Sequence, residues 1–249
     1  MNDVFVIESH AQGYRRYILR LHCMIKKLLV IIPFTLSITA MPVHAMSPFI
    51  TVFNTAYDRS HKEELLGSQQ MNLNNRYADS FVNDVFRDNI LLNLAYLSGD
   101  VTAANDINWD TIRKPSTYEF TLKPGEVFAF HDAIKPEYEA RTVITTNSHF
   151  NATDGYLSSG SLYGDGVCHF ASLINWAAHD AGLHVVSPVN HNFATIPGVP
   201  REYGTSIYYE PNVLEIGMSQ NLYIENTYDT PVKFVFASDG DSLTVSVYK

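Results

Sequence analysis

A short stretch from Gly164 to Ile174 limits what this chain can fold into more than any other part of the sequence. Two glycines, Gly164 and Gly166, predict a turn, and Cys168 follows directly. Apolar residues then recur at helical spacing until Gly182: Phe170, Leu173, Ile174, Ala177, Ala178 and Ala181. This spacing is typical of a helix with one buried face, and glycine commonly follows a helix end. The pattern predicts a core helix with Cys168 in its first turn.

The position of Cys168 allows two interpretations. Unpaired backbone N–H groups and the positive end of the helix dipole favour a thiolate in the first turn of a helix. A free cysteine also packs like a small hydrophobic residue, and many buried cysteines have no chemical role. Position alone leaves both a reactive thiol and a structural thiol open.

The N-terminal segment has the pattern of an export signal. It contains, in order, a basic pair, an apolar run and a small-residue cleavage site: Lys26-Lys27, Leu28 to Ala40 and Val43-His44-Ala45. These parts are typical of a secretory signal peptide, and the run is shorter than the roughly 20 residues that span a bilayer. We expect residues 1–45 to be an N-terminal extension and signal peptide, with Met24 as the true start. An uncleaved anchor is the alternative.

Removal of this segment changes the charge and the thiol content. It takes away five of the 17 basic and two of the 26 acidic residues, so the mature chain has a formal charge of −12. Nucleic acids and anionic membranes are bound through basic patches, so we expect neither as a partner. Cys23 is removed as well, which leaves Cys168 without a partner for an internal disulfide. We expect an exported protein, periplasmic or extracellular, with no integral span after cleavage.

The rest of the chain predicts an α+β fold. Residues 46–79 are mixed and polar and indicate an irregular lead-in to a folded domain over residues 80–249. Helical spacing from Tyr77 to Leu97, followed by Gly99, predicts a long N-terminal core helix. β-branched and aromatic residues predict strands at 118–122, 127–130, 141–150, 184–187, 207–209, 222–224, 232–236 and 243–247. We expect an antiparallel sheet packed on a central helix that starts at Cys168.

Chain geometry selects a histidine for Cys168. A reactive thiol needs a base or a cation within hydrogen-bond reach. The helix rises about 20 Å from Cys168 to Ala181, and a strand running back covers roughly 20–23 Å from His184 to His191. We therefore expect His191 to lie level with Cys168. Later polar residues could orient the imidazole, and spacing selects none of them: Asn221, Glu225, Asn226 and Asp229.

A metal centre is the rival chemistry. Candidate ligands are present, but no pair has a strong metal-binding spacing: His131, Asp132, His149, His169 and His191. We expect neither a metal nor another cofactor. The glycine-rich approach to Cys168 also lacks the lysine and the preceding strand of a phosphate-binding loop.

Four segments together resemble the VanW family, which is named for a protein of vancomycin-resistance gene clusters. In chain order they are Pro124 to His131 (Pro-Gly-Glu-x-Phe-Ser-Phe-Asn in the family), Gly164 to His169 (Gly-Gly-Gly-Val-Cys-Gln), Ala181 to His191 (Ala-Gly-Leu…His) and Asn221 to Asn226 (Asp-Leu-x-Phe-x-Asn). With Asp88-Asn89-Ile90, the resemblance covers residues 80–236. His169 stands at the family's Gln, and Asn221 stands at its Asp. The resemblance implies an exported or membrane-anchored envelope protein and implies no secure activity.

Two functional hypotheses follow. In the first, Cys168 and His191, with Asn221 as the third residue, form a thiol site that attacks an amide or ester carbonyl in a peptidoglycan peptide. The enzyme would be a hydrolase or acyl transferase, with oxyanion donors at the helix start: Gly166, Val167 and His169. The second is a non-catalytic envelope module that binds a peptide or glycan through aromatic side chains: Tyr156, Tyr163, Trp176, Tyr203, Tyr208 and Tyr209. The cysteine and histidine favour the first.

Overall fold

The computed structural model describes residues 63–160 and 163–249. The expected signal segment, Met24 and most of the expected lead-in lie outside the described residues. The described strands are β1 (Leu65–Asn72), β2 (Ser116–Leu122), β3 (Val127–Ala129), β4 (Thr142–Ile144), β5 (His184–Val186), β6 (Tyr223–Glu225), β7 (Val232–Ser238) and β8 (Ser242–Tyr248). The described α-helices are α2 (Ser80–Ser98), α3 (Trp109–Ile112), α4 (Pro136–Glu139), α5 (Val167–Asp180) and α6 (Leu214–Ser219).

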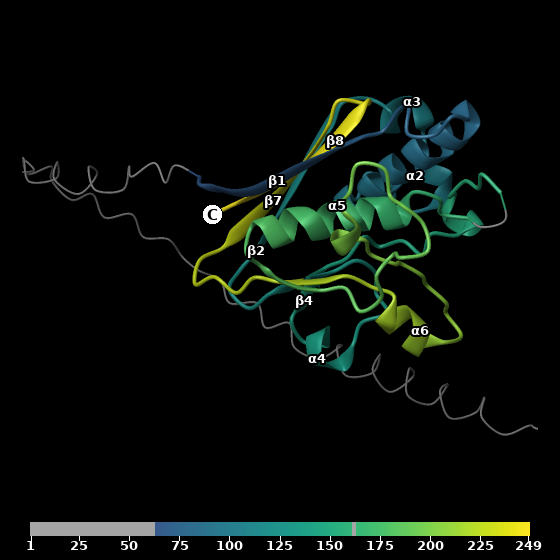
Figure 1. Ribbon diagram of the computed structural model, residues 1–249. Coiled ribbons are helices and arrows are strands. Elements are labelled where there is room, and N and C mark those ends of the chain that lie inside the picture. Colours follow the sequence, from purple (N-terminus) through teal and green to yellow (C-terminus); the bar gives the residue numbers. More distant parts are fainter. Residues whose placement is uncertain (1–62, 161–162) are drawn as a thin grey trace, which may run out of the picture. The chain divides into compact units, whose positions relative to one another are not determined.

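The strands form two four-stranded sheets around α5. The first sheet has the order β1-β8-β7-β2, and all its pairs are antiparallel. The second has the order β4-β3-β6-β5, in which only β3 and β4 run parallel. Helix α5 crosses the middle of the fold and packs against β1, β8, α2 and β5 (Figure 1). The α+β class is therefore confirmed, although two sheets replace the single antiparallel sheet that we expected.

Helix α5 has the register that the apolar pattern predicts. Its apolar face is fully buried, with Phe170, Leu173 and Ile174 inaccessible to solvent. Gly166 precedes the helix with a φ of 101°, and a Cβ there would lie 2.7 Å from the carbonyl oxygen of Phe86 on α2. Glycine therefore allows both the left-handed turn and the close approach of the two helices. This contact fixes the start of α5, and with it Cys168, against α2.

Helix α2 is a core helix with three buried polar residues, Asp88, Asn89 and Asn93. The Asp79 side chain accepts a hydrogen bond from the N–H of Phe81 at the helix start, and Gly99 ends the helix with a φ of 82°. Asp88 is 2% exposed and pairs with Arg113 at 2.6 Å, just after α3. Because an ion pair of a buried carboxylate is costly to break, this contact fixes α3 on α2.

The structure differs from the sequence predictions in three segments: residues 46–79, 141–150 and 207–209. β1 lies in the segment expected to be irregular, because its polar sequence is ordered by pairing with β8. β4 ends at Ile144, and positive φ angles at Asn147 and Phe150 prevent the strand expected over 141–150 from continuing. Residues 207–209 form no strand: the N–H of Ile207 donates to the Cys168 sulfur, and that of Tyr208 donates to the carbonyl of Gln220. These two backbone N–H groups therefore bind partners that do not belong to a β-sheet, and residues 207–209 cannot form a regular strand.

Candidate functional site

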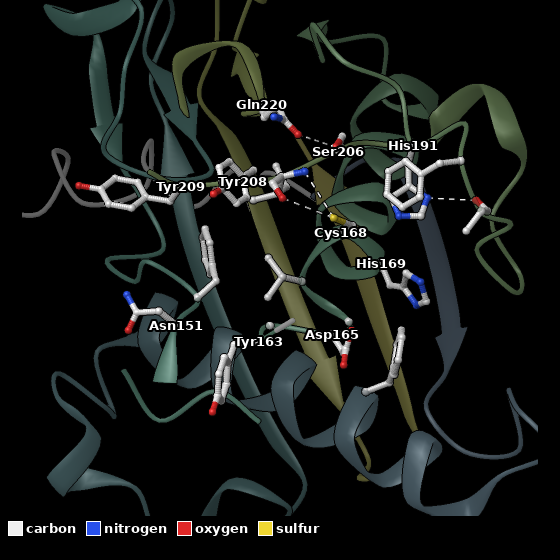
Figure 2. A pocket seen from close by; sticks show the side chains of 18 of the residues that line it. Asn151, Tyr163, Asp165, Cys168, His169, His191, Ser206, Tyr208, Tyr209 and Gln220 are labelled. Atoms are coloured by element: carbon white, nitrogen blue, oxygen red, sulfur yellow. Dashed lines mark hydrogen bonds between the residues drawn. The ribbon is translucent and has the colours of Figure 1, made fainter. Parts of the chain in front are cut away.

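A cavity of about 540 Å³ lies at the N-terminal end of α5 (Figure 2). Its lining joins the start of this helix to segments distant in sequence: Tyr77, Phe86, His149 to Asn151, Tyr163 to His169, His191, Phe193 to Thr195, Ser206 to Tyr209 and Gln220. Three aromatic side chains in the lining are largely exposed, Tyr163 (58%), Phe193 (76%) and Tyr208 (45%). The cavity therefore combines a polar inner part with an aromatic rim.

Cys168 contacts the backbone of Ile207. The N–H of Ile207 donates to its sulfur at 3.4 Å, and the thiol donates to the carbonyl oxygen of the same residue at 3.6 Å. Cys168 keeps part of its surface at the cavity. Burial nevertheless raises the pKa of the thiol to about 11, in spite of hydrogen bonds from backbone N–H groups that lower it. In this conformation the sulfur is a neutral thiol at pH 7.

His191 lies in the same cavity as Cys168, as the sequence geometry predicted, but a long loop rather than a strand brings it there (Figure 2). Its Nδ1 lies 3.1 Å from the carbonyl oxygen of Ala194. Because a carbonyl only accepts hydrogen bonds, Nδ1 carries the proton and Nε2 is the basic nitrogen. Burial lowers the pKa of the imidazole. Within the described ranges, no hydrogen bond joins His191 to Cys168.

His169 is enclosed by aromatic rings at the inner end of the cavity. Its ring centroid lies 4.8 Å from that of Phe86, 6.5 Å from that of Tyr77 and 6.1 Å from that of His191. The residue is 4% exposed, and its Nδ1 has no hydrogen-bond partner among the described residues. Burial, and then the charges of Arg76 and His191, lower its pKa well below the ordinary value. His169 is therefore neutral at pH 7.

The expected oxyanion donors differ in availability. Gly166 and Val167 both line the cavity, but the N–H of Val167 donates to the carbonyl of Gly164 at 3.0 Å. Within 63–160 and 163–249, the N–H groups of Cys168 and His169 donate to no other residue. The N–H of Gly166 likewise donates to no described residue, so the donors that remain open at the start of α5 belong to Gly166, Cys168 and His169.

Asn221 does not lie among the cavity-lining residues and instead connects two strands. Its amide nitrogen donates to the carbonyl oxygens of His131 and Ala133, both at 3.0 Å, and its side-chain oxygen accepts the N–H of His131 at 3.2 Å. It is fully buried. The structure therefore separates Asn221 from His191 and places it as a link between the end of β3 and the start of β6.

Sequence reasoning missed an acid–histidine pair beside the cavity. Asp132 and His149 were considered only as metal ligands, but the His149 Nε2 lies 3.2 Å from both carboxylate oxygens of Asp132. The His149 ring stacks on Tyr209 at 4.1 Å. Both His149 and Tyr209 line the cavity. No sequence spacing signals this pair, and the described residues contain no group of three or more His, Cys, Asp or Glu arranged to hold a metal.

The burial of His131 leads us to expect that the folded protein loses stability in acid. This side chain is fully buried beside this site, and burial lowers its pKa from 6.5 to about 4. Between pH 6.5 and 4, His131 binds a proton in the unfolded chain but stays neutral in the folded chain. The free energy of unfolding therefore decreases as the pH falls through this range. We expect this histidine to contribute about 2–3 kcal/mol of the loss between pH 7 and 4.5.

Urea unfolding of the full chain at pH 7 and at pH 4.5 measures this contribution. His131→Gln should reduce the acid loss by that amount, because glutamine keeps hydrogen-bonding groups without binding a proton in this range. His184→Gln, at a half-exposed histidine of β5 that lies 3.5 Å from Glu225, is the control for the loss of a histidine as such, and His131→Gln should reduce the acid loss by more than it does. An equal acid loss in His131→Gln and the unchanged chain would show that the prediction is wrong.

Comparison with known proteins identifies the family. The chain matches the family described as VanW like protein over residues 115–248, more than half of its length. That range contains Cys168, His191 and Asn221, and begins after the Asp88-Asn89-Ile90 segment of the sequence resemblance. No curated protein and no solved structure gives a significant match. Among the described helices, none is long and apolar enough to span a membrane. This chain belongs to the VanW family.

Proposed function

We propose that this chain is an exported cell-envelope protein that binds a peptide or glycan non-covalently in the cavity at the start of α5. The aromatic rim carries the proposal, because Tyr163, Phe193 and Tyr208 expose large ring surfaces around a concave site. Exposed aromatic groups are typical of sites that bind peptides or sugars. The volume of about 540 Å³ also lies within the range of small-ligand sites, roughly 300–1,000 Å³.

The envelope location rests on the sequence. The signal-peptide pattern of residues 1–45 and the exported character that the VanW resemblance implies both support it. In that setting, peptidoglycan peptides and glycans are polymers that such a cavity would meet.

The state of Cys168 favours binding over catalysis. A thiol nucleophile needs a lowered pKa or a base in contact, whereas burial raises the pKa of Cys168 to about 11. Both its donor and its acceptor capacity are used by the backbone of Ile207. Asn221, the expected third residue, binds the backbone of His131 and Ala133.

A cysteine-dependent hydrolase or acyl transferase is the second candidate. The shared cavity of Cys168 and His191 favours it, as do the unpaired N–H groups at the start of α5. In that mechanism Nε2 of His191 would take the thiol proton as the sulfur attacks a carbonyl carbon. The proton would then pass to the leaving amine or alcohol. Water, or an acceptor amine or alcohol in a transferase, would attack the thioester carbonyl, which releases the acyl group and restores the Cys168 thiol. The Cys168 sulfur would first have to break its two hydrogen bonds with the backbone of Ile207.

Binding of soluble muropeptides to the full chain, measured by titration calorimetry, tests the binding proposal. We expect Tyr208→Ala to weaken binding about tenfold, because loss of one aromatic contact removes on the order of 1.5 kcal/mol. Phe81→Ala is the matched control, since Phe81 is 59% exposed on α2 and does not line the cavity. Absence of binding, or an equal loss in both variants, would contradict the proposal.

A further inference from the structure

A histidine held by a carboxylate presents a free nitrogen at the cavity. His149 lines the cavity, and its Nε2 lies 3.2 Å from both carboxylate oxygens of Asp132. Because a carboxylate only accepts hydrogen bonds, Nε2 of the neutral ring carries the proton and Nδ1 is an acceptor. No hydrogen bond among the described residues uses Nδ1, and this atom is not among the buried unpaired polar atoms. Nδ1 is therefore open to a donor from outside the chain.

Other contacts fix the His149 ring without using Nδ1. The ring lies 4.1 Å from that of Tyr209, with the two planes 27° apart. The N–H of His149 donates to a carboxylate oxygen of Asp154 at 2.7 Å. The next residue, Phe150, has a φ of 61°, which is unfavourable for a bulky side chain. A Cβ at Gly164 would lie 2.8 Å from the carbonyl oxygen of Phe150, so glycine at that position lets the two loops meet.

Two neighbouring side chains of the lining also have unused hydrogen-bonding groups. The Asn151 oxygen accepts the N–H groups of residues 153 and 154, at 2.9 and 3.1 Å, whereas its amide NH2 donates to no described residue. The Tyr209 hydroxyl has no partner in the described ranges either, and neither group is among the buried unpaired atoms. Figure 2 shows Asn151 and Tyr209 across the cavity from His169. We call His149, Asn151 and Tyr209 the His149 cluster.

The charge of the cavity lining favours an uncharged ligand. The described lining contains no lysine and no arginine. Its carboxylate, that of Asp165, already accepts hydrogen bonds from the N–H and the hydroxyl of Ser159, both at 2.7 Å. A ligand group with a free carboxylate would lose its hydration here without meeting a basic side chain that is always charged. Neutral amides, hydroxyls and imidazoles instead suit a neutral ligand group.

The elements that form the lining favour a sugar over a peptide. No described strand contributes a residue to the lining, which is made of loops and of residues from α2 and α5. A peptide that adds a strand needs an exposed sheet edge, and an acidic peptide needs an arginine cluster. A sugar needs neither, because its apolar ring faces can lie on aromatic rings while its hydroxyls donate and accept hydrogen bonds at the ring edge. Exposed rings beside neutral hydrogen-bonding groups match that chemistry.

We propose that the His149 cluster is a sugar-binding subsite, and that the part of the ligand it holds is an uncharged sugar unit. This inference rests on the proposed binding function and chooses the glycan over the peptide. A sugar hydroxyl donates to Nδ1 of His149, and the Asn151 amide donates to a sugar oxygen. Asp132 is a positioning residue, because it keeps the proton on Nε2 and so leaves Nδ1 as the acceptor.

Two uncharged probes of different class test the subsite. The full chain is titrated calorimetrically with N,N′-diacetylchitobiose, a neutral disaccharide, and with acetyl-Tyr-Ala-Ala amide, a neutral peptide. We expect the disaccharide to bind at least about tenfold more tightly, corresponding to roughly 1.4 kcal/mol.

Variants assign the preference to His149. His149→Phe keeps an aromatic ring against Tyr209 and removes the acceptor, so sugar binding should weaken about tenfold. Asp132→Asn should weaken it by a smaller factor, because an amide can hydrogen-bond Nε2 either as donor or as acceptor. His184→Phe is the matched control and should leave sugar binding unchanged, since His184 also lies beside a carboxylate, 3.5 Å from Glu225, but does not line the cavity.

The ¹⁵N signals of the His149 ring give a second readout. They distinguish a protonated from an unprotonated ring nitrogen, so they report the proton position in the unchanged chain and in Asp132→Asn. We expect the disaccharide to shift the Nδ1 signal saturably and the peptide to leave it in place. We also expect Asp132→Asn to move part of the proton population to Nδ1, which a merely structural role of Asp132 would not do. This measurement keeps the test valid if His149→Phe does not fold.

The outcomes separate this inference from the function on which it rests. Preferential sugar binding with a shift of the Nδ1 signal, weakened in His149→Phe and kept in His184→Phe, supports the subsite. Tighter binding of the peptide, or sugar binding that neither shifts Nδ1 nor depends on His149, overturns the subsite and leaves the binding function in place. Failure of both probes to bind also overturns the subsite, and the muropeptide titration then decides the wider proposal.

Discussion

Alkylation of Cys168 by iodoacetamide at pH 7.5 is expected to be about 100-fold slower than that of an exposed thiol. The thiolate is the reacting species. Because burial raises the pKa from an ordinary value of 9.0 to about 11, the thiolate fraction at this pH falls by about two orders of magnitude. The contacts with the backbone of Ile207 hinder the sulfur further. Peptide mapping by mass spectrometry follows Cys168 separately from Cys23.

Two controls show whether burial or contact with His191 sets the alkylation rate of Cys168. Unfolding in urea should restore the rate of a free thiol, because it removes the burial. His191→Ala should leave the rate in the folded chain unchanged, since the described structure contains no hydrogen bond between the two side chains. Alkylation of folded Cys168 faster than a free thiol, slowed by His191→Ala, would instead establish the cysteine-dependent enzyme and displace the binding proposal.

Replacement of Asn89 by leucine is expected to reduce the free energy of unfolding by about 4 kcal/mol. Asn89 is fully buried on α2 and makes three hydrogen bonds to the loop that precedes Cys168. Its amide donates to the carbonyls of Leu157 (3.0 Å) and Asp165 (2.8 Å), and its oxygen accepts the N–H of Leu157 at 2.8 Å. Leucine would leave these buried groups unpaired, at about 1–3 kcal/mol each.

Urea unfolding measures this loss, and hydrogen exchange locates it. The amide of Leu157 should exchange faster in Asn89→Leu, and muropeptide binding should weaken because the loop forms one wall of the cavity. Asn74→Ala is the matched control: this partly exposed asparagine donates to Asp241 in an exposed hydrogen bond, and its loss should cost less than 1 kcal/mol. Unchanged protection of Leu157 in Asn89→Leu would show that another contact fixes the loop.

The two helix predictions were confirmed because their signals are local. Apolar spacing and the flanking glycines predicted the helices described as α2 and α5, and Gly99 follows α2 as expected. The same spacing placed Cys168 in the first turn of α5, and chain lengths placed His191 at the same end of the molecule. The family resemblance at these residues was confirmed over residues 115–248.

The polar contacts of the site depend on tertiary structure. Asn221 has a polar side chain at a plausible distance along the chain, but it hydrogen-bonds the backbone of His131 and Ala133, just after β3, instead of His191. The pairing of Asp132 with His149 arises where separate loops meet. Residues 207–209 have strand-like side chains, yet their backbone is used by Cys168 and Gln220.

The sequence by itself determined the α+β class, the two core helices and the family, because periodicity and short motifs are properties of neighbouring residues. Only the tertiary structure decided the chemical state of Cys168. The helix start favours a thiolate, whereas the enclosing chain removes the water that would stabilise its charge, and desolvation outweighs the N–H groups. Burial of this kind depends on residues distant in sequence, such as Ile207 in contact with the sulfur, and no local pattern encodes it.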